Sequence, residues 1–138
     1  MTDQHDYEQT IFDRAAGSIK VHGILSIIFG ALGTFFGFIF LIFIGLGGLI
    51  AGNQLDDVVG AFALGLFTFI LFILPHVYLI ISGVQLNRLT DPKAAKVLII
   101  INLVVGVLWN LVILIFAIIN LTQIGDYERY YKKFAHKK

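Results

Sequence analysis

Charged residues divide the sequence into three long apolar stretches separated by short polar segments. Residues 21–55, 58–87 and 97–125 contain 35, 30 and 29 residues without an Asp, Glu, Lys or Arg. A helix of about 20 apolar residues is long enough to cross a hydrocarbon core of roughly 30 Å. The pattern therefore predicts an all-α fold, an integral membrane helical bundle.

Small residues recur at three- and four-residue steps in the first apolar stretch. They are Gly23, Ser26, Gly30, Gly33, Thr34 and Gly37. This spacing places them on one face of a helix, and small side chains let helix backbones approach closely in lipid. We expect this face to pack against the small residues around Gly65 and Thr68, or against a second copy of the chain.

Gly and Pro residues predict where the helices end or bend. The first stretch is too long for one straight crossing, and the glycines at 45–52 indicate a helix end near residue 49. A loop would follow through Asn53, Gln54, Asp56 and Asp57. Pro75 predicts a kink at residues 71–75, because proline has no backbone N–H and clashes with the preceding turn.

The N-terminal segment, residues 1–20, is polar and acidic but has an apolar face. Its apolar residues at four-residue steps are Tyr7, Ile11, Ala15 and Ile19. We expect a short amphipathic helix at the membrane interface with Asp6 as its N-cap, or else a partner-docking arm. The segment has no basic region before an apolar core, so we expect an uncleaved insertion signal.

The C-terminal segment combines aromatic and basic residues at helical spacing. The residues expected to anchor it at the headgroup level are Tyr127, Tyr130, Tyr131, Lys132 and Lys133. The chain is thus expected to consist of an amphipathic segment at 1–20, a transmembrane helical domain at 21–125 and a basic aromatic tail at 126–138.

The third apolar stretch fits two structures. One is a single long helix that carries Asn102, Gly106, Asn110 and Asn120 on one face. The other is a hairpin that turns at residues 106–110, with Trp109 at the interface and Asn110 capping the last helix. Asp91 and Pro92 predict the start of this region as N-cap and first helical residue.

Lys and Arg counts favour the hairpin. Residues 1–20, 56–57, 88–96 and 126–138 hold two, none, three and five of the ten basic residues. Three crossings would place five on each side of the membrane, whereas four would place all ten on one side. The positive-inside rule therefore favours four crossings, the last two short, with both termini cytoplasmic in a cell (inner or plasma) membrane.

Few residues are candidates for chemistry. His76 is the one ionisable residue well inside an apolar stretch, so it could relay protons or bind a ligand, alone or with Asn102 and Asn110. The alternative is a neutral imidazole and carboxamides that hydrogen-bond between helices. His22 lies next to Lys20 and is expected at the membrane edge.

Several classes of function have no support in the residues. The four histidines have no metal-ligand spacing, the glycines lack the flanking residues of a phosphate loop, and the chain has no cysteine. A net charge of +1 provides no field that would recruit nucleic acid. We expect no cofactor, no catalytic residues and no nucleic-acid partner.

Two short motifs carry a resemblance to known proteins. They are Ser-Gly-Val-Gln-Leu-Asn-Arg at 82–88 and Ala-Ala-Lys-Val-Leu-Ile at 94–99. With the glycine-rich first stretch, they resemble small bacterial membrane proteins of about four spans and unknown function. The resemblance implies no activity. The chain departs from this pattern at residues 106–110, where a proline-containing turn would be expected.

The sequence therefore favours a non-enzymatic integral membrane protein that acts through helix packing. Its partner would be another membrane protein, for which it is an accessory or scaffold subunit, or a second copy in a homo-oligomer. The alternative is a small transporter or channel in which His76, Asn102 and Asn110 line a pathway.

Overall fold

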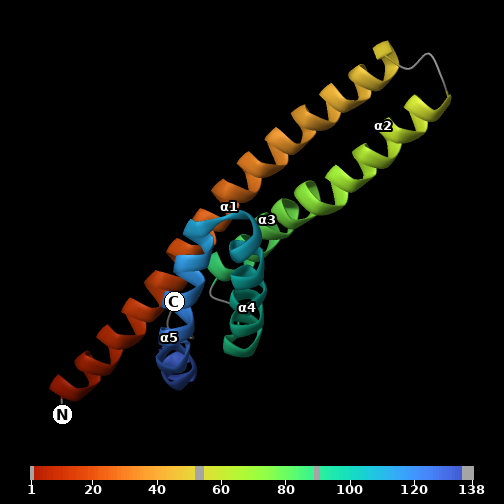
Figure 1. Ribbon diagram of the computed structural model, residues 1–138. Coiled ribbons are helices and arrows are strands. Elements are labelled where there is room, and N and C mark those ends of the chain that lie inside the picture. The colour runs from red at the N-terminus through yellow and green to blue at the C-terminus, as the bar shows by residue number, and fades with distance from the viewer. Residues whose placement is uncertain (1, 52–54, 89–90, 135–138) are drawn as a thin grey trace. The chain divides into compact units, whose positions relative to one another are not determined.

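The computed structural model is helical throughout nearly all of the residues that it describes, which are 2–51, 55–88 and 91–134. The elements in chain order are α1 (Thr2–Ala51), α2 (Leu55–Thr68), η1 (Phe69–Ile73), α3 (Leu74–Asn87), α4 (Pro92–Trp109) and α5 (Leu111–Phe134) (Figure 1).

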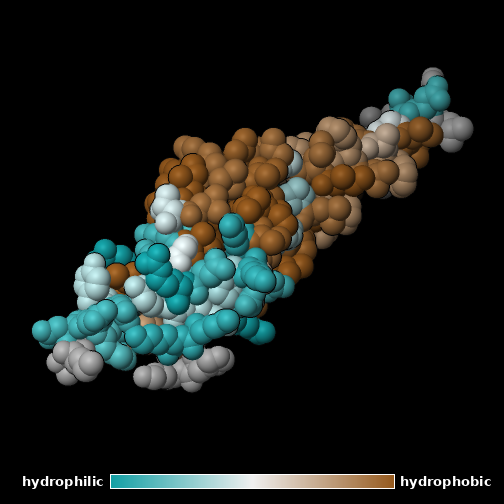
Figure 2. Space-filling model, turned by 90° about the horizontal axis from the view of Figure 1, so that it is seen from below, coloured by the Kyte–Doolittle hydropathy of each residue, from teal (hydrophilic) through white to brown (hydrophobic). Residues whose placement is uncertain are grey.

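Four helical segments within the described residues are long and apolar enough to cross a membrane. They are Asp3–Gly48, Asp56–Asn87, Pro92–Trp109 and Leu111–Phe134. The predicted all-α bundle with four such helices is confirmed, and the last two form the expected hairpin. In Figure 2 the hydrophilic and hydrophobic parts of the surface occupy separate areas, as membrane proteins require.

The chain divides into two compact units. The four-helix unit consists of Met1–Ile27 and Ile81–Lys138, so it contains the first half of α1, the end of α3, and α4 and α5. The hairpin unit consists of Ile28–Ile80, so it contains the rest of α1, α2, η1 and the start of α3.

In the four-helix unit, α1 and α5 run antiparallel. The rings of Phe12 and Tyr127 stack with centroids 5.7 Å apart and planes at 10°, and the rings of His5 and Phe134 meet edge-on at 5.4 Å. The beginning of α1 therefore lies beside the end of α5. The buried core around them is Phe12, Ala15, Ala16, Ile19, Leu86, Ala95, Ile99, Ala117, Ile124, Tyr127 and Phe134.

The α4–α5 hairpin begins and turns at the residues expected from the sequence. Asp91 accepts a hydrogen bond from the backbone N–H of Lys93 at 3.1 Å, and Pro92 is the first helical residue. Asn110 alone separates the two helices. Its Oδ1 accepts from the N–H groups of Val112 and Ile113 at 3.0 and 3.2 Å, so it caps α5 as predicted.

In the hairpin unit, glycines of α1 contact the returning helix at successively earlier positions. A Cβ at Gly30 would lie 2.6 Å from the carbonyl oxygen of His76, and one at Gly37 would lie 2.8 Å from Ile73. Further along α1, a Cβ at Gly48 would lie 2.5 Å from Ala61. The two arms are therefore antiparallel and so close at these positions that an added Cβ would force a neighbouring atom to shift.

Two local predictions differ from the structure. Residues 1–20 are not a separate helix capped by Asp6, because α1 runs without interruption from Thr2 to Ala51. Asp56 and Asp57 are not loop residues but lie in the first turn of α2, where acidic side chains stabilise the positive end of the helix dipole. Asn53 and Gln54 lie outside the described residues.

A single π-helical turn, η1, overlaps residues 71–75, where the sequence predicts a kink. In η1 the N–H of Leu74 bonds to the carbonyl of Phe69, five residues back. The wider turn comes directly before Pro75, which has no N–H of its own to bond to the preceding turn. The chain thus continues as helix past the proline.

Candidate functional site

The imidazole of His22 lies between two carboxamides inside the four-helix unit. Asn120 Nδ2 is 2.9 Å from His22 Nδ1, and Asn102 Nδ2 is 3.3 Å from His22 Nε2. All three side chains are fully buried. One residue from α1 thereby connects α4 and α5 through both of its ring nitrogens.

Serine hydroxyls complete this polar cluster. Ser18 donates to Asn120 Oδ1 at 2.8 Å and Ser82 to Asn102 Oδ1 at 3.0 Å, while Asn102 Nδ2 donates to Ser26 Oγ at 3.4 Å. The polar cluster, as the term is used below, is Ser18, His22, Ser26, Ser82, Asn102 and Asn120. Its members come from α1, α3, α4 and α5, which are all the helices of this unit.

Hydrogen-bond counting shows how the polar cluster is satisfied. A neutral imidazole has one N–H donor and one acceptor nitrogen, so only one of the two carboxamides can donate to it. Exchanging the amide oxygen and nitrogen of the other carboxamide would let its oxygen accept from the ring N–H and its NH₂ donate to its serine, whose hydroxyl accepts as well as donates. The cluster can therefore pair its ring nitrogens and amides internally, as buried polar groups in an apolar bundle must.

The chemistry of the polar cluster is that of hydrogen bonding between helices. It contains an imidazole, two carboxamides and three hydroxyls, but no carboxylate that would act with the imidazole as a general acid or base. Within the described part of the chain, no group of three or more His, Asp or Glu side chains is placed to hold a metal ion. The arrangement provides specific packing of four helices.

The three polar residues predicted to share a site are held by different partners. Asn102 belongs to the polar cluster, and Asn110 caps α5. His76 lies in the hairpin unit, where its Nδ1 is 2.5 Å from the carbonyl oxygen of Phe72 and must carry the proton, because a carbonyl only accepts.

Sequence reasoning missed the central residue of this site. His22 was expected at the membrane edge because Lys20 precedes it, whereas the structure buries it completely. A signal was present, since Ser18, His22 and Ser26 recur at four-residue steps and so share one face of α1. An apolar helix with three polar residues on one face indicates a polar contact with other helices.

The predicted small-residue face lies in close contacts within the chain. Gly23 faces Gly83 in the four-helix unit, where a Cβ at Gly23 would lie 2.6 Å from the Gly83 carbonyl oxygen. A Cβ at Gly33 would overlap the ring of His76 in the hairpin unit. Gly65 is less constrained, because its Cβ would meet Leu41 at an ordinary 3.7 Å. Ser26 belongs to the polar cluster.

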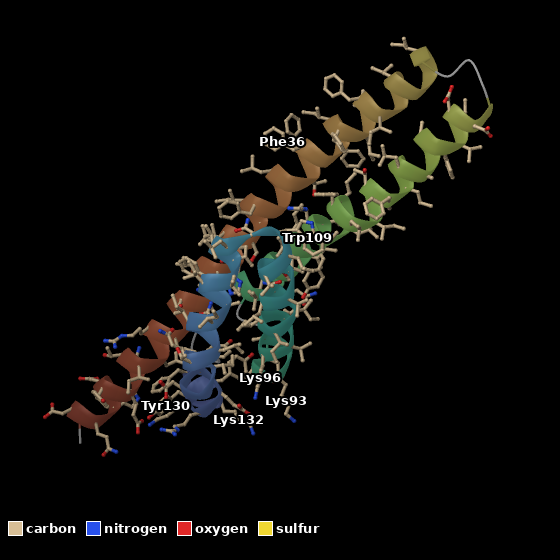
Figure 3. All side chains as sticks on the ribbon, viewed as in Figure 1. Phe36, Lys93, Lys96, Trp109, Tyr130 and Lys132 are labelled. Atoms are coloured by element: carbon tan, nitrogen blue, oxygen red, sulfur yellow. The ribbon has the colours of Figure 1, made fainter. Side chains whose placement is uncertain are left out.

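The predicted anchor residues are divided between the core and the surface. Tyr127 is fully buried against Phe12, so its side chain belongs to the protein core. Lys133 pairs with Glu8 of α1 and Lys132 is exposed. Figure 3 shows Tyr130 and Lys132 near the end of α5, with Lys93 and Lys96 at the end of α4 that is opposite to Trp109.

Tyr131 lies at the edge of the core around Phe12 and Tyr127. Its ring centroid is 5.3 Å from that of Tyr127. Tyr130 likewise contacts Phe134 at 6.2 Å. Both are only partly buried, so they border the aromatic core on the side of the basic residues.

Comparison with protein-family models, with curated proteins and with solved structures finds no match for this chain.

Proposed function

We propose that this chain is a non-enzymatic integral membrane protein that binds a partner by helix packing, as an accessory or scaffold subunit or as a homo-oligomer. The observation that carries the proposal is a contrast among the glycines of the hairpin unit. Those at 30, 33 and 37 fill close contacts within the chain, whereas a Cβ at Gly45, Gly47 or Gly60 would meet nothing within 4 Å.

Glycine inside a helix lowers its stability by about 1 kcal/mol relative to alanine. The closely packed glycines offset this cost through contacts with the neighbouring helix. The open glycines have no such contact within the chain, although their backbone is as accessible to another helix as that of a packing face. A partner helix that packs against Gly45 and Gly60 would provide the missing contact.

The surface beside Gly45, one of the open glycines, has the shape that helix packing requires. A shallow pocket of about 200 Å³ is lined by Gly45, Gly48, Val58, Ala61 and Phe62. A large ring projects beside it, since Phe62 is one of its lining residues and is 74% exposed. Hollows next to projecting rings are complementary to the side chains of a second helix, by the same knobs-into-holes packing that joins helices in bundles.

The transporter alternative has weaker support. A pathway needs polar groups that are free to exchange partners with a solute, and Asn102, Asn110 and His76 make hydrogen bonds to other protein groups. The fully buried side chain of Asn102 lines no surface that a solute reaches.

Leucine substitutions at open glycines test the proposal. Gly45→Leu and Gly60→Leu would leave the fold intact, because the space is open and leucine favours helix. We expect them to abolish the partner or second copy that co-purifies, or crosslinks, with the wild-type protein in mild detergent. Gly17→Leu and Gly125→Leu are matched controls, since these glycines are equally open but lie in the four-helix unit.

Two results would contradict the proposal. One is a wild-type protein that is monomeric and without a partner at native abundance. The other is that Gly45→Leu and Gly60→Leu retain as much of the co-purifying partner as the two control variants do.

A further inference from the structure

A second pocket lies in the four-helix unit, between the first turns of α1 and the last turns of α5. It has a volume of about 290 Å³. Its lining residues are Tyr7, Ile11, Arg14 and Ala15 from α1, and Gln123 and Asp126 from α5. Neither the polar cluster nor the open glycines contribute to it.

The charge pattern places this pocket at the level of the lipid headgroups. On α1 the charged residues end at Lys20, and on α5 they resume at Asp126 after the uncharged stretch. Arg14 therefore lies on the polar side of the boundary, and Gln123 lies about one helical turn on the apolar side of Asp126. A pocket that straddles this boundary faces phosphates and ammonium groups of the bilayer.

The lining of the pocket carries both signs of charge, one on α1 and one on α5. Arg14 provides a fork of N–H donors that suits a phosphate. Asp126 provides a carboxylate, and Gln123 adds an amide side chain to the lining. The carboxylate suits a group that carries both a positive charge and N–H donors.

We propose that this pocket binds the headgroup of a phospholipid that carries a primary ammonium, such as phosphatidylethanolamine. The phosphate lies against Arg14, and the ammonium donates to Asp126. Phosphatidylcholine has a phosphate but no N–H to donate to this carboxylate. Phosphatidylglycerol has no cation for Asp126. The apolar side chains of Ile11 and Ala15 line the rest of the pocket.

Native mass spectrometry of the full chain tests this proposal. Released from mixed micelles that contain the three phospholipids in equal amounts, the wild type should retain phosphatidylethanolamine in preference to the other two. Arg14→Gln should reduce that retention roughly tenfold, the effect of one lost charge-assisted hydrogen bond. Asp126→Asn should retain lipid but no longer distinguish ethanolamine from choline.

Both variants change side chains that are not fully buried, and helicity measured by circular dichroism verifies their fold.

Lys93→Gln is the matched control, since Lys93 is an exposed cation of the same unit outside the pocket. Equal retention of all three lipids by the wild type, or equal losses in Arg14→Gln and Lys93→Gln, would overturn the proposal. Soluble phosphoethanolamine distinguishes the source of the headgroup. If it binds in place of phosphatidylethanolamine and no lipid is retained, the pocket is a site for a soluble ligand and the lipid assignment is wrong.

Discussion

Asn120 Nδ2 lies 2.9 Å from Nδ1 of His22, although 98 residues separate the two along the chain. Both side chains are fully buried, and Ser18 donates to the other end of the Asn120 carboxamide at 2.8 Å. The contact joins the first helix to the last in the apolar part of the four-helix unit. It therefore specifies the register of α1 against α5, which apolar side chains alone would leave less defined.

The first prediction concerns this contact. Asn120→Leu should lower the free energy of unfolding by about 1–3 kcal/mol, because it leaves a ring nitrogen of His22 and the Ser18 hydroxyl unpaired. The double variant His22→Leu/Asn120→Leu should lose less than the sum of the single variants, with a coupling energy of about 0.6–2 kcal/mol. Denaturant titration in mixed micelles measures both values.

Thr122→Val is the control for this cycle. The Thr122 hydroxyl donates to the carbonyl of Ile119 on its own helix and is exposed, so its loss should change the unfolding free energy by no more than about 0.5 kcal/mol. Strict additivity of the His22 and Asn120 variants would show that the hydrogen bond does not couple the helices.

The second prediction compares two glycines of α1. A Cβ at Gly30 would lie 2.6 Å from the backbone oxygen of His76, which cannot rotate away as a side chain would. Gly30→Ala should therefore destabilise the hairpin unit by about 1–3 kcal/mol, the usual cost of overpacking. Gly45→Ala should instead stabilise it by up to about 1 kcal/mol, because the site is open and alanine favours helix. The same titration distinguishes them, and equal effects would contradict the packing described here.

Features determined by neighbouring residues were predictable from the sequence. Asp91 and Pro92 begin a helix, and Asn110 caps one, because capping depends on hydrogen bonds within three residues. The residues that share the glycine face were also predictable, because helical periodicity alone decides which side chains lie on one side of a helix.

Features that depend on helix register were not predictable. His22 and Asn120 meet only because α1 continues without a break past residue 20, so that polar and apolar segments share one helix. The position of Tyr127 was not predictable either. Aromatic residues at helical spacing beside lysines are typical of both a headgroup anchor and an interhelical core, and only the position of Phe12 distinguishes the two.

The third prediction concerns topology. Phe12 stacks on Tyr127 and Glu8 pairs with Lys133, so the two ends of the four-helix unit are adjacent. Because the chain has no cysteine, single cysteines introduced by Asp3→Cys and Lys132→Cys can be labelled without background. An impermeant thiol reagent should label both from the same side of the membrane, which the positive-inside rule predicts to be the cytoplasm.

Asp57→Cys provides the comparison for this labelling. It lies in the first turn of α2, after the first predicted crossing, and should be labelled from the opposite side. Labelling of Asp3→Cys and Lys132→Cys from different sides would exclude an even number of crossings. It would also exclude the placement of all ten Lys and Arg residues on one side of the membrane.

The last prediction concerns the single residue between α4 and α5. The Oδ1 of Asn110 accepts from two backbone N–H groups at the start of α5, which have no carbonyl partner within the helix. Asn110→Ala should therefore cost about 0.5–2 kcal/mol of unfolding free energy, whereas Asn110→Gly should cost only a few tenths. Amide hydrogen exchange locates the effect, because protection should fall first at Val112 and Ile113. If alanine and glycine have equal effects and exchange at these two amides is unchanged, the side chain is not the cap, and the hairpin is held by the packing of α4 on α5 alone.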